Sequence, residues 1–143
     1  MTITRTATAR YRGMGKEGQG ELTTQSGVLD RQKYGFGTRF GDEPGTNPEE
    51  LIAAAHAGCF TMALSAQLTG AGLKPERLET KCTITLDQVE GGFSITSSAL
   101  ELKAKVPGAS QEAFDQAAQA AKAGCPVSKL YNTNITLTAV LEG

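Results

Sequence analysis

The sequence has few residues with strong metal or redox chemistry. It contains a single histidine, His56, and three cysteines, Cys59, Cys82 and Cys125. One imidazole excludes a metal centre that needs two histidine ligands from one chain. The cysteines form no CxxC pair of the zinc or thioredoxin type, and they are too few for a disulfide-stapled secreted domain. Any chemistry of these cysteines is therefore thiol chemistry, and we expect neither a metal nor another cofactor.

An excess of one charge is also lacking. The 143 residues carry 14 Lys plus Arg and 15 Asp plus Glu, without the basic run or basic-aromatic stripe of nucleic-acid binders. The N-terminal segment MTITRTATARYRG has no apolar core after its basic residues, so it predicts neither a secretory signal nor an anchor. We expect one domain over residues 1–143, in the cytoplasm, with no nucleic-acid and no membrane partner.

The N-terminal third predicts strands and a loop. Residues 2–12 alternate and are rich in threonine, and ELTTQ at 21–25 suits a second short strand. Together they predict an N-terminal meander. Residues 30–45 combine glycine, aromatic and charged residues without a period, so we expect a loop there.

A long apolar helix is expected next. Asn47 suits the N-cap, Pro48 the first helical position and Glu50 the third, and Gly70 or Gly72 suits the end. The apolar residues encircle the helix axis, which predicts burial on every side. A membrane span is the alternative, disfavoured by the polar and acidic residues of the segment. Because one chain has few elements to surround such a helix, we expect a homodimer with paired central helices.

The second half of the chain predicts a hairpin, two helices and a last strand. Alternation with period two begins at Leu78 and resumes after a turn at 90–92. Ser110 suits the N-cap of an alanine-rich helix that ends near Gly124, and Pro126 can open a short helix. Residues 135–141 alternate as a final strand. These elements predict an α+β fold with mainly antiparallel sheets around a long buried central helix.

The three cysteines differ in their expected surroundings. Cys82 shares a strand face with Ile84 and Leu86, where burial raises a thiol pKa, so we expect it to be inert. Cys59 has polar neighbours on its helix, yet its surroundings are apolar enough that a thiolate there needs a cation. Cys125 lies at an expected helix start, where backbone N–H groups favour a thiolate, so it suits a resolving thiol.

The other polar residues near Cys59 have structural interpretations. His56 precedes Cys59 by three residues, which suggests a base-activated thiol or half of a metal site, but a hydrogen-bonded core or interface histidine is favoured. Glu49 and Glu50 are acidic residues of the kind preferred in a first helical turn, and Glu50 completes the helix cap. Taken alone, Arg39 is best interpreted as a solvated loop charge.

Three segments, in order along the chain, resemble the signature blocks of a known family. They are YGFGTRF at 34–40, GTNPEELIAAAHAGCF at 45–60 and AGCPVS at 123–128. They look like blocks of the osmotically inducible protein C family, which also contains the organic hydroperoxide resistance proteins. The arginine of the TRF block is similar to that of the osmotically inducible branch, because the other branch carries its arginine nearer the N-terminus. Arg10 and Arg12 are therefore only reserve candidates.

The resemblance implies an intertwined homodimer that reduces organic hydroperoxides, and hydrogen peroxide more weakly. It implies Cys59 as the peroxidatic cysteine, Cys125 as the resolving cysteine, and Arg39 with Glu49 as a supporting ion pair. No catalytic role is carried over to the remaining cysteine or to the histidine. The implied reductant is an external dithiol, which in relatives is a lipoyl dithiol.

The residue types indicate how such a site works. A thiolate attacks the O–O bond, so Cys59 needs its pKa lowered by the Arg39 guanidinium, which Glu49 orients through a bidentate pair. The resulting sulfenic acid condenses with Cys125 to a disulfide, which prevents irreversible oxidation. We expect the apolar residues Phe60, Met62 and Ala63 to contact the alkyl group of the substrate.

Two other functions are compatible with the sequence. A peroxide sensor or binding protein uses the same disulfide to change a partner interaction without turnover. A metal protein uses Cys59, Cys125 and His56 as ligands, although only His56 and Cys59 form a short chelating pair.

The spacing of Glu49 and Cys59 raises a geometric problem. Ten residues of continuous helix separate the two by about 15 Å and rotate their side chains by about 80°. One arginine cannot easily contact both. Either the helix breaks near Gly58, or Arg39 and Glu49 of one chain serve Cys59 and Cys125 of the other, which is the arrangement we favour.

Overall fold

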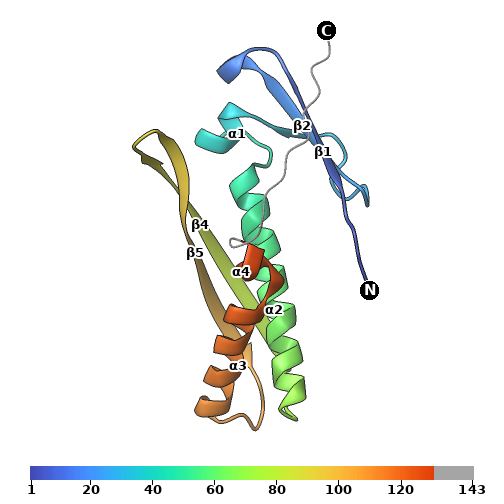
Figure 1. Cartoon of the computed structure of the whole chain (residues 1–143), viewed down its shortest axis with the longest axis vertical. Helices are drawn as coiled ribbons and strands as arrows, with labels where there is room; N and C mark the ends of the chain where they lie inside the picture. Colours follow the sequence, from blue (N-terminus) through green and yellow to red (C-terminus); the bar gives the residue numbers. More distant parts are fainter. Residues whose placement is uncertain (131–143) are drawn as a thin grey trace. The chain divides into compact units, whose positions relative to one another are not determined.

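The computed structural model describes residues 1–130 as a mixed α/β chain with a three-stranded and a two-stranded sheet. The elements in chain order are β1 (Ala7–Arg12), a 3-10 turn (Gly15–Glu17), β2 (Gln19–Thr24), β3 (Gln32–Tyr34), α1 (Phe36–Phe40), α2 (Pro48–Gly70), β4 (Arg77–Val89), β5 (Gly92–Lys105), α3 (Gln111–Gly124) and α4 (Pro126–Leu130) (Figure 1). They form two compact units: residues 1–53 with 84–97, and residues 54–83 with the chain from residue 98. The strand predicted at 135–141 lies outside the described residues.

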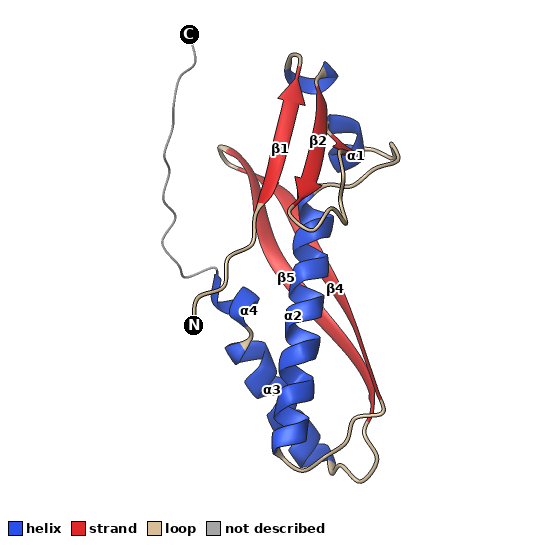
Figure 2. Ribbon diagram, turned by 90° about the vertical axis from the view of Figure 1, so that its right-hand side faces the viewer, coloured by secondary structure: helices blue, strands red, loops and turns tan. Residues whose placement is uncertain are grey.

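The first unit contains an antiparallel sheet in the order β1-β2-β3. β1 and β2 pair from Ala7 opposite Thr24 to Arg12 opposite Gln19, which confirms the expected meander (Figure 2). The expectation of a loop over 30–45 is wrong in part, because β3 and α1 lie within it. Both elements are too short to show a period, and β3 exists because it pairs with β2.

The connection from α1 to α2 depends on Gly45. Its φ is +149°, and a Cβ at this position would lie 2.7 Å from the carbonyl oxygen of Lys33. The N–H of Thr46 donates to that same carbonyl at 3.1 Å. Because only glycine lets the backbone pass so close to β3, this contact fixes the point at which α2 begins.

The start of α2 agrees with its sequence signals, with one correction. The Asn47 side-chain oxygen accepts from the Glu50 N–H at 2.8 Å, as expected for an N-cap. The Glu50 carboxylate does not complete that cap. It accepts from the Thr46 hydroxyl at 2.8 Å instead.

The long helix α2 buries a single stripe within the described chain. His56, Phe60, Leu64 and Leu68 follow each other at intervals of four and are its buried residues. Burial on every side is therefore not reached within one chain. By length and composition α2 also qualifies as a membrane span, but Leu64 and Leu68 are fully buried against protein, as in a core helix.

The second unit has a small apolar core between α2, α3 and the segment that follows α3. Its buried members are Phe60, Leu64, Leu68, Ala117, Ala121 and Cys125. Full burial of a leucine contributes about 2 kcal/mol, so this cluster is a main source of the unit's stability. Ser110 caps α3 by accepting from the Ala113 N–H at 3.1 Å, as predicted. In β4, Leu78, Cys82 and Ile84 are half-buried at alternate positions, which agrees with the predicted period.

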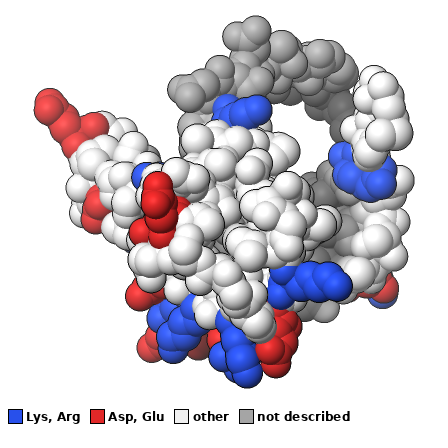
Figure 3. Space-filling view, turned by 90° about the horizontal axis from the view of Figure 1, so that it is seen from below, with Lys and Arg blue, Asp and Glu red and all other residues white. Residues whose placement is uncertain are grey.

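Figure 3 shows both basic and acidic side chains on the surface, and the two kinds lie beside each other along the lower edge of the view. This distribution agrees with the nearly balanced composition, 14 Lys plus Arg against 15 Asp plus Glu.

Candidate active site

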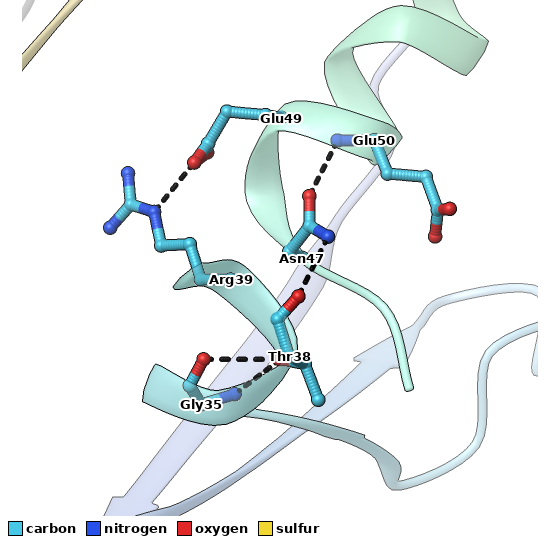
Figure 4. Close-up of polar contacts among 6 residues, drawn as sticks. All are labelled: Gly35, Thr38, Arg39, Asn47, Glu49 and Glu50. Atoms are coloured by element: carbon cyan, nitrogen blue, oxygen red, sulfur yellow. Dashed lines mark hydrogen bonds and ion pairs between the residues drawn. The ribbon is translucent and has the colours of Figure 1, made fainter. Parts of the chain in front are cut away.

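The first unit brings Arg39 and Glu49 together, as the sequence comparison implied. Arg39 Nε donates to Glu49 Oε1 at 2.6 Å (Figure 4). The contact is a single bond, not the expected bidentate pair, and the terminal nitrogens of the guanidinium point away from the carboxylate. The Glu49 side chain is only 12% exposed. The Arg39 side chain is 38% exposed, so the ion pair is shielded from water on the carboxylate side and open on the guanidinium side.

Two neighbouring residues position this pair. The Thr38 hydroxyl accepts from the Gly35 N–H at 2.8 Å and donates to the Gly35 carbonyl at 3.1 Å, which closes the first turn of α1. Asn47 caps α2 with its oxygen and donates from its amide nitrogen to the Thr38 carbonyl at 3.1 Å (Figure 4). One amide thus joins the helix that carries Arg39 to the helix that carries Glu49. The sequence showed Asn47 only as a cap.

An aromatic hollow lies beside Arg39. It has a volume of about 200 Å³, and its lining includes Tyr11, Tyr34, Phe36, Phe40 and Pro48 together with Arg39. The guanidinium carbon lies 5.4 Å from the centre of the Phe40 ring, within the range of a cation–π contact. A guanidinium on an apolar wall suits a molecule with one polar oxygen and an alkyl body. The residues of this hollow were not identified from the sequence.

The second unit brings Cys59 and Cys125 together. Cys59 lies on α2 and Cys125 between α3 and α4, and their sulfur atoms are 2.9 Å apart. Both are free thiols. Cys125 is completely buried, whereas Cys59 is half-buried. The two cysteines that the resemblance pairs therefore lie side by side, and their reaction with each other stays a prediction.

The two thiols are shifted in opposite directions. Burial raises the pKa of Cys59, and the hydrogen bond with Cys125 raises it further. Burial alone would raise the pKa of Cys125 as well, but its hydrogen bonds with Cys59, Ser128 and Val127 outweigh burial and lower that pKa. In the chain as described, Cys125 therefore holds a negative charge more readily than Cys59 does.

His56 is a hydrogen-bonded core histidine, as the sequence favoured. It is 4% exposed. Its Nδ1 lies 2.6 Å from the hydroxyl of Ser98 and its Nε2 lies 2.8 Å from that of Ser128. Cys82 lies 3.2 Å from the same Ser98 hydroxyl.

The three ligands of the metal-site alternative, Cys59, Cys125 and His56, have other contacts. Within residues 1–130, no three His, Cys, Asp or Glu side chains gather in a way that could hold a metal ion. Both nitrogens of His56 contact serine hydroxyls.

The residues expected to bind substrate are dispersed. Phe60 is buried in the core of the second unit, and Ala63 packs against that core. Met62 is 77% exposed and lines a shallow hollow near Pro75. Their contact with substrate stays a prediction. The reserve candidates Arg10 and Arg12 line a separate hollow on the first unit.

The chain is similar in sequence to a known protein family and to several of its members. The family described as OsmC-like protein matches residues 41–140. The chain is 51% identical to peroxiredoxin OsmC of Escherichia coli K12 over 99% of both chains. It is 35% identical to the organic hydroperoxide resistance protein of Xanthomonas axonopodis pv. citri, over 68% of this chain and 67% of that one.

Solved structures agree with the fold. The crystal structure of the organic hydroperoxide resistance protein OhrB of Bacillus subtilis matches with a TM-score of 0.64 at 28% identity, over 90% of this chain and 92% of that one. The crystal structure of an organic hydroperoxide resistance protein from Elizabethkingia anophelis matches with a TM-score of 0.67 at 28% identity, over 94% of this chain and 93% of that one. Both carry the organic hydroperoxide resistance name.

Proposed function

The chain belongs to the OsmC-like protein family, and from that premise we propose that it is a thiol-dependent peroxidase for organic hydroperoxides. Cys59 is the nucleophile and Cys125 the resolving cysteine. The observation that carries the proposal is the sulfur–sulfur distance of 2.9 Å between two free thiols. A disulfide of about 2.05 Å requires the sulfurs to approach by only about 1 Å. The names of the relatives, peroxiredoxin and organic hydroperoxide resistance protein, support a peroxide-related redox role.

In the first step the Cys59 thiolate attacks the hydroxyl oxygen of the hydroperoxide. The S–O bond forms as the O–O bond breaks, and the alkoxide takes up a proton and departs as an alcohol. The raised pKa of Cys59 makes a cation necessary for the thiolate. Arg39 provides it, because a guanidinium stays charged and its terminal nitrogens are turned away from Glu49. These donors also stabilise the charge that develops on the alkoxide.

In the second step Cys125 attacks the sulfenic acid on Cys59, and water is released as the disulfide forms. An external dithiol then reduces the disulfide, and a lipoyl protein is the proposed donor. Because Cys125 is completely buried beside Cys59, the sulfenic acid meets this thiol before a second peroxide. This order protects Cys59 from oxidation to a sulfinic acid.

We propose that a complete site takes residues from two copies of the chain. α2 is one helix from Pro48 to Gly70, so a break near Gly58 does not bring Glu49 and Cys59 together. Along this helix the two are about 15 Å apart. We therefore propose an intertwined homodimer in which Arg39 and Glu49 of one protomer serve Cys59 and Cys125 of its partner. Two-fold packing of the central helices brings the start of one beside the middle of the other.

Two broader assignments accompany this proposal. Residues 1–143 form a single domain, an assignment supported by α2, β4 and β5, each of which runs through both compact units. We also propose that the protein acts in the cytoplasm.

Organic hydroperoxides are the proposed substrates because of the apolar wall next to Arg39. Each methylene buried in the hollow between Tyr34, Phe36 and Phe40 contributes about 0.8 kcal/mol, so a short alkyl chain yields tenfold selectivity or more. We expect kcat/KM for cumene hydroperoxide to exceed that for hydrogen peroxide at least tenfold. Steady-state assays with both substrates and one dithiol check this, and equal values contradict it.

Serine substitutions test the roles of the cysteines. Cys59→Ser abolishes peroxide consumption, because the nucleophile is lost. Cys125→Ser permits one oxidation, after which Cys59 proceeds to a sulfinic acid that mass spectrometry detects. Cys82→Ser is the matched control and retains most activity.

Turnover separates the enzyme from a peroxide sensor. Many cycles with excess dithiol support the peroxidase. One stoichiometric oxidation followed by arrest, or full activity in Cys59→Ser, contradicts it.

A further inference from the structure

Three phenylalanine rings of the first unit form a row that begins in the hollow beside Arg39. The rings of Phe36 and Phe40, both from α1, have centroids 4.9 Å apart, and the Phe93 ring lies 5.1 Å from that of Phe40. Phe36 and Phe40 line the hollow, whereas Phe93 comes from the start of β5. Phe93 therefore extends the apolar wall of the hollow with a ring from a distant part of the chain.

The three rings remain exposed although they contact each other. Phe36 is 40% exposed, Phe40 43% and Phe93 54%. A phenylalanine buries about 200 Å² when it is enclosed, so the three together still expose roughly 300 Å². Contacts within the chain do not cover this aromatic surface. An open apolar patch of such a size on a soluble protein is often a binding site.

Positive charge lies at one part of the row. The Arg39 guanidinium carbon is 5.4 Å from the centre of the Phe40 ring, and Lys16 Nζ is 5.1 Å from the centre of the Phe36 ring. Within residues 1–130, Phe93 has no such contact with a cation. A molecule with its polar oxygen at Arg39 can therefore lay an apolar body across Phe40 toward Phe93.

The turn of the hairpin determines where Phe93 lies. Gly91 has a φ of +89° and Gly92 a φ of +145°, which glycine adopts without strain, and Phe93 follows directly. Residues 84–97 belong to the same compact unit as α1. The contact between Phe93 and Phe40 thus lies within one folded unit.

We propose that Phe93 is a specificity-determining residue, which binds the aryl or long alkyl substituent of a hydroperoxide whose peroxide group lies at Arg39. The inference rests on the proposed peroxidase function and narrows its substrates to hydroperoxides with a bulky apolar body. In this arrangement Phe93 contacts the body of the substrate and not the reacting atoms. Its contribution is therefore to binding and not to the chemical step.

A second copy of the chain is the alternative occupant of the row. A stable interface buries about 800 Å² on each partner, more than twice the roughly 300 Å² that the three rings expose. The charges of Arg39 and Lys16 beside the rings also disfavour an interface core, because such cores are depleted in charged residues. The row thus has the size and the polarity of a site for one small molecule.

The test uses two hydroperoxides that differ in one group. Cumene hydroperoxide carries a phenyl group where tert-butyl hydroperoxide carries a methyl group, so the ratio of their kcat/KM values measures recognition of the phenyl group. We expect Phe93→Ala to lower this ratio at least about fivefold, as loss of about 40 Å² of buried apolar surface implies. KM for cumene hydroperoxide rises while kcat stays within twofold, because the contact is the same in the ground state and the transition state.

Two variants serve as matched controls. Phe93→Tyr keeps the aromatic ring, so the ratio stays within twofold of wild type. Val89 is another apolar residue of the hairpin, 42% exposed, and Val89→Ala also leaves the ratio within twofold. Thermal unfolding shows whether each variant is folded, and light scattering measures its mass.

Each other outcome has a definite meaning. An unchanged ratio in Phe93→Ala overturns the inference, and so does an equal loss for both hydroperoxides, since Phe93 then only supports Arg39. A lower mass with equal loss for both assigns the row to an interface between copies and overturns it too. If Phe93→Ala does not fold, Phe93→Leu replaces it, and a ratio that falls less than twofold overturns the inference. If wild-type protein turns over neither hydroperoxide, the proposed peroxidase function itself is wrong, and this inference with it.

Discussion

The Cys59 thiol is placed where it does not ionise easily by itself. Burial and the bond with Cys125 both raise its pKa. Near neutral pH such a thiol reacts slowly with peroxide unless a positive charge stabilises the thiolate. Glu49 holds Arg39 through a single Nε contact, which leaves the other guanidinium donors for the proposed contact with the reacting atoms.

The pH dependence of alkylation measures this effect at the level of single residues. In a Cys82→Ser/Cys125→Ser background, the rate of Cys59 alkylation by iodoacetamide follows the thiolate fraction. We expect Arg39→Ala to move the inflection to higher pH, because the desolvated thiol then lacks its cation.

Arg31→Ala serves as the control, since this exposed arginine has no contact with Glu49. It should leave the alkylation profile unchanged. An identical inflection in Arg39→Ala and wild-type protein would show that Arg39 does not activate Cys59.

The family resemblance paired Cys59 with Cys125, but no sequence pattern showed the hydrogen-bonded surroundings of the two sulfurs. Cys125 was expected at a helix start because Gly124 and Pro126 flank it, and it lies between α3 and α4. The contacts of His56 with Ser98 and Ser128 span 42 and 72 residues. No spacing rule links serines so distant, and only the packed core brings them to one imidazole.

Among the secondary-structure elements, the junction of α1 and α2 is the one that organises the candidate site. Asn47 caps α2 and also ties it to Thr38 at the end of α1. Asn47→Ala should cost about 1 kcal/mol of folding free energy, as loss of an N-cap does. It should also lower kcat/KM at least about fivefold, because Arg39 and Glu49 lose their common support.

Ser110→Ala is the matched control for this substitution. It removes the N-cap of α3, a bond to the Ala113 N–H, at a similar cost in stability. Thermal unfolding should show similar losses in both variants, while only Asn47→Ala loses activity beyond the loss of folded protein. If the two variants have equal activity per folded protein, Asn47 acts only as the N-cap of α2.

The elements also show where sequence reasoning failed. Capping residues located α2 and α3, because a cap acts through neighbours three residues away. The segment 30–45 was expected to be a loop, yet Gln32–Tyr34 forms β3 by pairing with β2. β3 forms because it pairs with Gly20, Glu21 and Leu22 of β2. A strand of three residues is too short to show an alternating pattern in the sequence.

For the whole molecule, the decisive property is whether two chains share each active site. Co-expression of separately tagged Glu49→Ala and Cys59→Ala chains tests it. With random pairing, half of the dimers are mixed and each holds one intact site of two, so about a quarter of wild-type activity should return. Each single variant by itself should be inactive.

The purified mixed dimer provides the sharper measurement. An active mixed dimer supports sharing between protomers. An inactive one, formed from two inactive parents, means that each chain completes its own site. The sequence raised this question, because ten residues of continuous helix separate Glu49 from Cys59.

In the proposed cycle, the complete burial of Cys125 also determines which sulfur of the oxidised protein the reductant attacks. Cys125 has no exposed surface, whereas Cys59 is partly accessible. An incoming dithiol must therefore attack the Cys59 sulfur and form its mixed disulfide there. Cys125 is then the leaving group, and its lowered pKa makes it a good one. The same backbone and hydroxyl groups that favour the Cys125 thiolate thus accelerate the return to the dithiol state. Which sulfur is attacked and which one leaves is therefore determined by the protein and not by the reductant.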